Sequence, residues 1–360
     1  MVGAFFRKRK WALWAYGGGV VLLLSLYFQV HLLTLLNDWY GGFYNILQQA
    51  TKHSLDEFWA AILRFASIAT PYVLLVTITN YFSRLYAIRW REAITFYLIP
   101  KWQEVPLEIQ VEGISQRIQE DAYRFARIVE TLGIQVIRSM MLLVAFLPIL
   151  WQLSKRVDAP FITGYPTLHL IESLSGETAA TLYKYGEFGA TTLNYVPGLL
   201  VWVALIVSVG GMVISWFVGI KLPGLEYNNQ KVEAAFRKKL VLGEDELEHR
   251  GTLPLVELFT GIKFNYHRLF LHYGYFDIWA NIFYRVMEVV PYLIAAPALF
   301  SGMIMLGVLV QISNAFDKVQ QSMSLFIDNW TTVTELRSIW KRLHETIAKL
   351  KEYEVPSPSR

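Results

Sequence analysis

The first apolar stretch of the sequence runs from Trp11 to Leu36, 26 residues without a formal charge. An α-helix rises about 1.5 Å per residue, so about 20 apolar residues cross the roughly 30 Å hydrocarbon core of a bilayer. The stretch is too long for the core of a signal peptide, and no small-residue cleavage site closes it. We therefore expect a membrane-spanning helix at this position.

Five further apolar stretches follow the first one. They lie at about 58–86, 133–153, 197–220, 276–300 and 301–330. Only 17% of the residues are charged, whereas soluble domains carry about 25%. The last stretch contains Asp317, Lys318 and Asp328, so we expect its second half to face protein or water instead of lipid. The sequence predicts an all-α, polytopic membrane protein with about six transmembrane helices.

The lysines and arginines indicate the orientation of these helices. Of these residues, 26 lie on one side of the predicted spans and four on the other, while Arg64, Arg138 and Arg285 lie within spans. Basic residues accumulate in cytoplasmic loops, so this asymmetry predicts a multi-pass membrane protein with both termini in the cytoplasm. The basic excess is then topological, and we expect no nucleic-acid partner.

Two long cytoplasmic segments, at about 87–132 and 221–275, are charged and compatible with helix. The simplest interpretation is that the second to fifth spans extend as long helices beyond the membrane. We treat residues 1–345 as one transmembrane domain with these extensions and residues 346–360 as a C-terminal tail. The apolar spacing from Leu336 to Leu350 is typical of an amphipathic helix.

Several kinds of catalytic or cofactor site are missing from the sequence. It has no cysteine, no GxxxxGK[ST] phosphate-binding loop, no GxGxxG and no GxSxG nucleophile motif. The closest histidines, His267 and His272, are five residues apart and poorly aligned for a shared metal ion. We therefore expect neither an enzyme nor a cofactor or metal site, and no ATP hydrolysis by a domain of the phosphate-loop type.

One polar stripe follows the fourth span. Glu226, Asn229, Glu233 and Arg237 are spaced by three and four residues, which places them on one face of a helix. Such a stripe is a proton relay or a cavity wall if it faces a vestibule. The alternative is a solvated helix surface with ordinary pairs such as Glu233 with Arg237.

A second set of charges precedes the third span. Glu120 and Arg124 have helical spacing, and Glu130 lies where the span begins. A carboxylate at a membrane boundary can take up a proton, because loss of water disfavours its charged form. The alternative is an interfacial residue that stays hydrated.

Glu288 lies inside the fifth span, three residues after Arg285. Ionisable residues within a membrane are candidates for function. The alternative is a structural pair between Arg285 and Glu288.

The sequence resembles the SbmA/BacA family of bacterial inner-membrane peptide-antibiotic transporters. The matching segments are SQRIQEDAYRFARIVE, LLVAFLPIL, VGIKLPGLEYNNQKVEAAFRK with VLGEDE after it, NYHRLFLHYGYFDI and WTTVTELRSIWKRL. They follow one another over about three quarters of the chain, and the central segment is the most specific.

This resemblance implies a homodimer whose architecture is like the membrane domain of ABC exporters without the ATPase. It also implies uptake of proline-rich and modified antimicrobial peptides, driven by protons, with glutamates along a large central cavity. Position by position, those glutamates are Glu130, Glu226, Glu233 and Glu244. Two alternatives remain open: the membrane half of an ABC transporter with a separate ATPase subunit, and a protein that handles membrane lipids or fatty-acyl groups.

Overall fold

The computed structural model describes residues 2–105, 114–157, 197–245 and 252–352. Within these ranges every regular element is a helix, which confirms the predicted all-α fold. The long helices are α2 (Gly19–Gln48), α3 (Leu55–Gln103), α5 (Ala122–Ser154), α8 (Leu199–Gly219), α9 (Leu222–Asp245), α10 (Thr252–Phe300), α11 (Leu306–Asp328) and α12 (Trp330–Glu352). The short ones are α1 (Val2–Phe6), η1 (Arg9–Trp11), η2 (Leu13–Gly18), η3 (Ala50–Lys52), α4 (Ile114–Gln116) and η4 (Arg117–Asp121), of which η2 and η4 are π-helical.

Five helical stretches are long and apolar enough to cross a membrane. They are Arg9–Gln48, Leu55–Gln103, Arg117–Ser154, Leu199–Gly243 and Leu253–Phe300. The sixth predicted span is α11, which is helical but does not reach the apolar content of the other five. It packs against α2, α5, α8 and α10, so its polar residues are surrounded by other helices and not by lipid alone.

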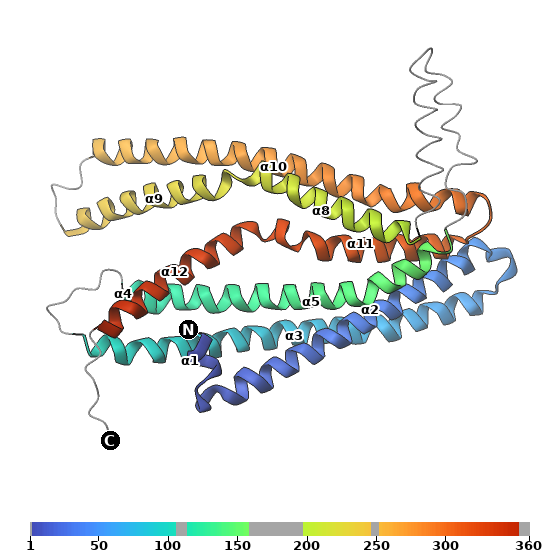
Figure 1. Ribbon diagram of the computed structural model, residues 1–360, viewed down its shortest axis with the longest axis horizontal. Helices are drawn as coiled ribbons and strands as arrows, with labels where there is room; N and C mark the ends of the chain where they lie inside the picture. Colours follow the sequence, from blue (N-terminus) through green and yellow to red (C-terminus); the bar gives the residue numbers. More distant parts are fainter. Residues whose placement is uncertain (1, 106–113, 158–196, 246–251, 353–360) are drawn as a thin grey trace, which may run out of the picture.

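The long helices continue well beyond the length that a bilayer requires. α3 and α10 contain 49 residues each, which corresponds to about 70 Å of helix against a core of about 30 Å. Figure 1 shows that α9 and the first half of α10 run side by side, as do the end of α3 and the start of α5. The two predicted helical extensions are thus present in the residues that the structure describes.

The helix ends lie in two groups, one at each end of the bundle. In Figure 1 the turn between α2 and α3 and the connection from α10 to α11 lie at one end of the bundle. The ends of α3, α9 and α12 lie at the other end, and α1 lies on that half of the molecule. Residues 346–352, expected in the tail, continue α12, because Ile347 and Leu350 are buried against the bundle.

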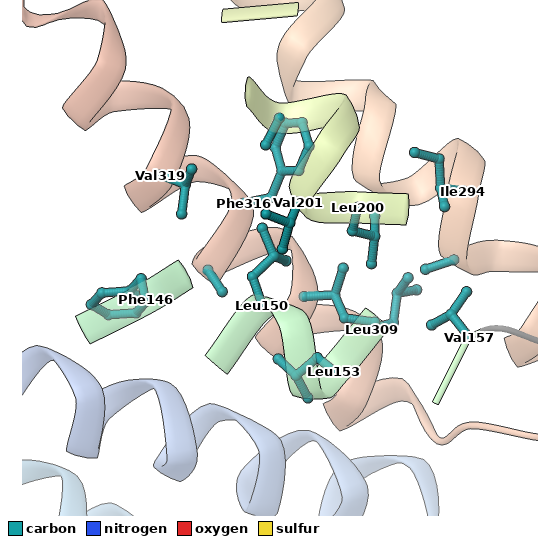
Figure 2. Close-up of a cluster of buried hydrophobic side chains, with 14 of the residues drawn as sticks. Phe146, Leu150, Leu153, Val157, Leu200, Val201, Ile294, Leu309, Phe316 and Val319 are labelled. Carbon is teal, nitrogen blue, oxygen red and sulfur yellow. The ribbon is translucent and has the colours of Figure 1, made fainter. Parts of the chain in front are cut away.

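One hydrophobic cluster holds the membrane half of the bundle together. It joins side chains from α5, α8, α10 and α11, including Phe146, Leu150, Leu200 and Phe316, all of them almost fully buried (Figure 2). A second cluster lies in the other half and joins α1, α3, α5 and α12. The extension formed by the end of α3 and the start of α5 therefore has a core of its own.

α2 and α11 approach each other closely where α11 begins. A Cβ atom on Gly307 would overlap the carbonyl oxygen of Gly41, so only glycine fits at this crossing. The side chains of Gln48 and Asn45 accept hydrogen bonds from the backbone N–H groups of Leu306 and Gly307, at 2.7 and 2.9 Å. These bonds satisfy donors that the first turn of a helix otherwise leaves unpaired.

Candidate functional site

The polar stripe predicted after the fourth span lies on α9. Glu226 and Glu233 are half-buried, Arg237 is exposed, and Asn229 is only 4% exposed. The Oδ1 atom of Asn229 is buried without a hydrogen-bond partner in the described part of the chain. Glu233 and Arg237 do not form the ion pair that a solvated helix face would favour. The stripe is therefore a partly buried face.

α9 is held in place by α10. The rings of Phe236 and Phe259 lie 5.9 Å apart, and the side chain of Val232 lies 3.8 Å from the position of a Cβ on Gly261. The carboxylate of Glu226 is close enough to α10 to act electrostatically on Tyr273. The stripe thus lies along the junction of the two extended helices.

Glu130 lies on α5, one residue before Thr131, and only 7% of it is exposed. The Thr131 hydroxyl donates a hydrogen bond to the Glu130 carboxylate at 3.2 Å. No lysine or arginine among the described residues forms an ion pair with it. Ile128 and Leu132 on either side belong to the second hydrophobic cluster. Glu130 is therefore a buried carboxylate without a countercharge next to it.

A cavity of about 500 Å³ brings two of the predicted site residues together. Its lining comes from α3, α4, η4, α5 and α9, and consists of Arg91, Ser115, Gln119, Glu120, Tyr123 and Arg237. The Arg91 guanidinium lies 5.0 Å from the centre of the Tyr123 ring and donates to the carbonyl oxygen of Gln119 at 3.3 Å. The cavity therefore presents two guanidinium groups, from Arg91 and Arg237, to a ligand.

A second cavity, of about 460 Å³, adjoins the first and shares Arg91 and Gln119 with it. The apolar side chains of Ile88, Phe96 and Ile118 contribute to its lining. Together the two cavities offer charged groups next to an apolar surface. This combination suits a ligand that has both polar and apolar parts.

The predicted supporting residues Glu120 and Arg124 belong to a network that extends to α12. Arg124 forms ion pairs with Glu120 at 2.8 Å and with Glu335 at 3.1 Å. Beside them, Arg342 of α12 donates to both carboxylate oxygens of Asp121, at 3.0 and 2.8 Å. These hydrogen bonds and the charge of Asp121 raise the pKa of the Arg342 guanidinium above its ordinary value.

The sequence did not single out Asp121, Glu335 and Arg342, although the amphipathic pattern of α12 was recognised. A charged residue on the buried side of that pattern is a signal for a partner on another helix. The partner itself could not be identified, because Arg342 and Asp121 are 221 positions apart.

Glu288 and Arg285 form an ion pair at 2.7 Å on α10. This is the structural pair that the spacing of three residues allowed. The side chain of Arg285 is 81% exposed and that of Glu288 is 61% exposed. Both residues lie in a stretch that is long and apolar enough to span a membrane. Charged side chains are costly in lipid. The pair therefore needs water or another protein surface beside it.

The second half of α11 was expected to face protein or water, and of its three charged residues Asp317 and Lys318 are partly covered while Asp328 is exposed. The Asp317 carboxylate is within electrostatic range of Glu288 on α10. The hydroxyl of Tyr284 donates to the carboxylate of Asp328. These groups form a polar strip between α10 and α11.

One predicted site residue, Glu244, has a side chain outside the described residues, although its backbone belongs to α9. Among the residues that the structure describes, no group of three or more histidine, cysteine or acidic side chains is arranged to hold a metal ion.

The model of a protein family described as the SbmA/BacA-like family matches residues 8–183 and 188–351. The chain is 28% identical over 343 residues to the "Inner membrane ABC transporter ATP-binding protein YddA" of Escherichia coli. The aligned region covers 91% of this chain and 56% of that protein. It is 22% identical over 348 residues to an ABC transporter ATP-binding protein of Haemophilus influenzae, covering 92% of this chain and 53% of the relative.

A more distant similarity extends to plants. The "ABC transporter D family member 2, chloroplastic" of Arabidopsis thaliana is 25% identical over 213 residues, covering 53% of this chain and 29% of that protein. The chain therefore spans about half the length of the first two relatives and less of the third.

Proposed function

The chain belongs to the SbmA/BacA-like family of membrane transporters, and from this premise we propose that it takes up peptides, driven by a proton gradient. In this proposal two copies form a homodimer in a bacterial inner membrane, with both termini in the cytoplasm. The long helices enclose a central cavity by an ABC-exporter-like arrangement. Proline-rich and modified antimicrobial peptides are the expected substrates, and Glu130, Glu226, Glu233 and Glu244 are the expected proton-coupling residues.

The observation that carries the proton coupling is the position of Glu130. Its carboxylate is buried, has no ion-pair partner among the described residues and lies where α5 passes from its cytoplasmic extension into the predicted span. In this proposal the carboxylate at this position takes up and releases the proton that is coupled to transport.

The electrical driving force has a suitable magnitude. One proton that moves down a potential of about 100 mV releases about 2.3 kcal/mol. A carboxylate that takes up a proton from one side and releases it to the other can use this free energy to favour inward movement of substrate. Glu226 and Glu233 on α9 extend the set of such groups along the helical extension.

The exposed pair Arg285–Glu288 supports the homodimer. Its side chains extend from α10 within an apolar stretch, where lipid contact would be costly. A second copy with a water-filled cavity between the two would provide a polar environment for the pair. The half-buried Asp317 on the neighbouring α11 would lie close to the same cavity.

The cavity around Arg91 and Arg237 supports a peptide as the ligand. Guanidinium groups bind carboxylates and carbonyl oxygens, and the Tyr123 ring provides an apolar contact. The adjoining apolar cavity accommodates side chains next to this polar part. A lining of mixed character is compatible with peptides that differ in sequence.

The proposal is tested with the purified chain in proteoliposomes that contain no nucleotide. Entry of a labelled proline-rich peptide is measured with an imposed pH gradient at zero membrane potential, and again after a protonophore has collapsed this gradient. We expect uptake only while the proton gradient is present. Uptake that is unaffected by its collapse would contradict proton coupling.

A second candidate is an ABC-type transporter in which this chain is the membrane part and ATP supplies the energy. The observation that favours it is that the relatives of about twice the aligned length are named as ATP-binding proteins. The chain itself contains no phosphate-binding loop of the GxxxxGK[ST] type. Uptake in the nucleotide-free proteoliposomes would exclude this candidate, whereas uptake that requires a separate ATPase and ATP would establish it.

A further inference from the structure

The first residues of the chain form a hook that is fixed to α3. This N-terminal hook, residues 2–11, consists of α1, η1 and the two residues between them, and α1 lies against α3 (Figure 1). Phe5 is fully buried: its ring stacks on Trp90 at 5.3 Å and meets Tyr86 edge-on at 5.3 Å. Trp11 completes this aromatic cage. The hook therefore has a defined position on the bundle.

Two hydrogen bonds strengthen the attachment. The hydroxyl of Tyr16 donates to the carbonyl oxygen of Phe6 at 3.1 Å, which links the hook to the start of the first predicted span. The hydroxyl of Tyr86 on α3 donates to the carbonyl oxygen of Ala15 at 3.1 Å. The hook, η2 and α3 are thus joined by polar as well as aromatic contacts.

Four consecutive cations, Arg7, Lys8, Arg9 and Lys10, lie on the exposed side of the hook. Within the described part of the chain none of them forms an ion pair with a carboxylate. Lys8 lies 5.3 Å from the centre of the Tyr97 ring. Aromatic rings position these cations but leave their charge uncompensated.

Lys10 shows how the hook and α3 share this arrangement. Its ammonium group lies 5.1 Å from the Trp11 ring and 5.7 Å from the Phe96 ring of α3. A further cation, the guanidinium of Arg89, lies 5.2 Å from the Trp14 ring, and Arg89 also forms an ion pair with Glu92. The cations are therefore held above an aromatic surface formed by two separate segments.

The cation cluster adjoins the part of the chain that would contact lipid. Leu13, Tyr16 and Val20 follow directly after the hook, and their side chains are exposed. They begin the first of the apolar stretches long enough to span a membrane. Unpaired cations next to such a surface lie at the level of lipid headgroups, where Lys and Arg interact favourably with anionic lipids.

We propose that the N-terminal hook binds the headgroups of anionic phospholipids in the adjacent leaflet. The phosphate oxygens would contact Lys8 and Lys10, and the acyl chains would lie along Leu13 and Val20. This site differs from the cavity around Arg91 and Arg237 and from the carboxylates assigned to transport, although Lys10 lies over Phe96, which also lines the second cavity. Because Phe5 packs on Trp90, next to Arg91 of the cavity, a bound lipid would also stabilise α3 where the cavity is formed.

The test measures thermal unfolding of the purified full chain in mixed micelles that contain either phosphatidylglycerol or phosphatidylcholine with identical acyl chains. We expect a higher Tm in phosphatidylglycerol and the retention of this lipid in native mass spectra. K8Q/K10Q removes two cations but keeps the aromatic cage, and its affinity for phosphatidylglycerol should fall by roughly fivefold for each cation removed. Increased ionic strength should reduce the difference between the lipids.

K238Q/K349Q is the matched control, since it removes two exposed lysines, from α9 and α12, that do not belong to the hook. It should keep the full preference for phosphatidylglycerol. Equal Tm values of the unaltered chain in the two lipids would overturn the proposal. An equal loss of affinity for phosphatidylglycerol in K8Q/K10Q and K238Q/K349Q would also overturn it. If millimolar inorganic phosphate reproduced the stabilisation in phosphatidylcholine, the site would bind free phosphate and the lipid assignment would be wrong.

Discussion

The guanidinium of Arg342 donates to both carboxylate oxygens of Asp121, at 3.0 and 2.8 Å, and so connects α12 to the π-helical turn that precedes α5. Asp121 is almost completely buried, whereas Arg342 is only half-buried. The Arg117 guanidinium adds a hydrogen bond from η4 to the Thr346 hydroxyl of α12 at 2.5 Å. Because η4 also lines the cavity through Gln119 and Glu120, α12 helps to fix the cavity wall.

Arg342→Ala should destabilise the protein by about 1.5–3 kcal/mol, because it leaves the buried Asp121 carboxylate without its charged hydrogen-bond donor. Arg342→Lys should recover only part of this loss, since an ammonium group cannot reproduce the two parallel hydrogen bonds. Chemical denaturation in detergent measures the free energy of unfolding of both variants and of the unaltered chain.

The matched control is Lys341→Ala on the same helix. Lys341 is exposed and lies 4.0 Å from Glu345, and such surface pairs contribute at most about 1 kcal/mol. Equal losses of stability for Arg342→Ala and Lys341→Ala would show that the pair with Asp121 has no special structural role.

Gly307→Ala should strongly destabilise the bundle, because the added Cβ would overlap the carbonyl oxygen of Gly41 and separate α2 from α11. Gly210→Ala on α8 is the control, since no atom outside the local helix lies within 4 Å of its Cβ position. That change should be neutral or stabilise the helix by up to about 1 kcal/mol. Thermal unfolding of the two variants in one detergent compares them, and similar Tm values would contradict the close approach of α2 and α11.

Cysteine labelling tests the orientation of the chain, and the absence of native cysteines makes it direct. Cysteines at Lys52, in the turn between α2 and α3, and at Lys184, which lies outside the described residues, should react with an impermeant reagent added from the periplasm. Cysteines at Lys239 on α9 and Lys349 on α12 should react only after the cells are opened. Periplasmic labelling at Lys239 would overturn the topology.

Native mass spectrometry from mild detergent tests the homodimer. We expect the mass of two chains, because the exposed pair Arg285–Glu288 needs a polar environment that one chain in lipid does not provide. A species of 41.5 kDa that still transports peptide after reconstitution would contradict this prediction.

The sequence predicted the helices and their approximate lengths well, because apolar periodicity and charge depletion are local properties of the chain. The pair Arg285–Glu288 was also accessible, since a spacing of three residues places both side chains on one helix face. The cavity could not be predicted, because Arg237 and Glu120 are distant in the sequence and line it only in the folded chain. The burial of Asn229 could not be predicted from the sequence either, because periodicity does not show which side of a polar stripe faces another helix.

Among the predicted carboxylates, Glu130 and Glu233 are the most informative to replace. A glutamine keeps the shape and hydrogen-bonding capacity of each side chain but removes the proton that can be exchanged. Glu226→Gln and Glu244→Gln should also reduce uptake, the latter less, because other acidic residues surround Glu244 in the GEDE segment. Glu345→Gln on α12 is the control, since Glu345 is exposed and forms only a surface pair.

The most direct test of proton-coupled uptake is the initial rate of peptide entry into nucleotide-free proteoliposomes under an imposed pH gradient, measured for the unaltered chain and for Glu130→Gln/Glu233→Gln. Circular dichroism, Tm and native mass must first show that the double variant folds and assembles like the unaltered chain. We predict that its uptake falls to the rate of protein-free liposomes, while Glu345→Gln transports normally. Gradient-dependent uptake by the folded double variant at the unaltered rate would contradict a role of these carboxylates in proton coupling.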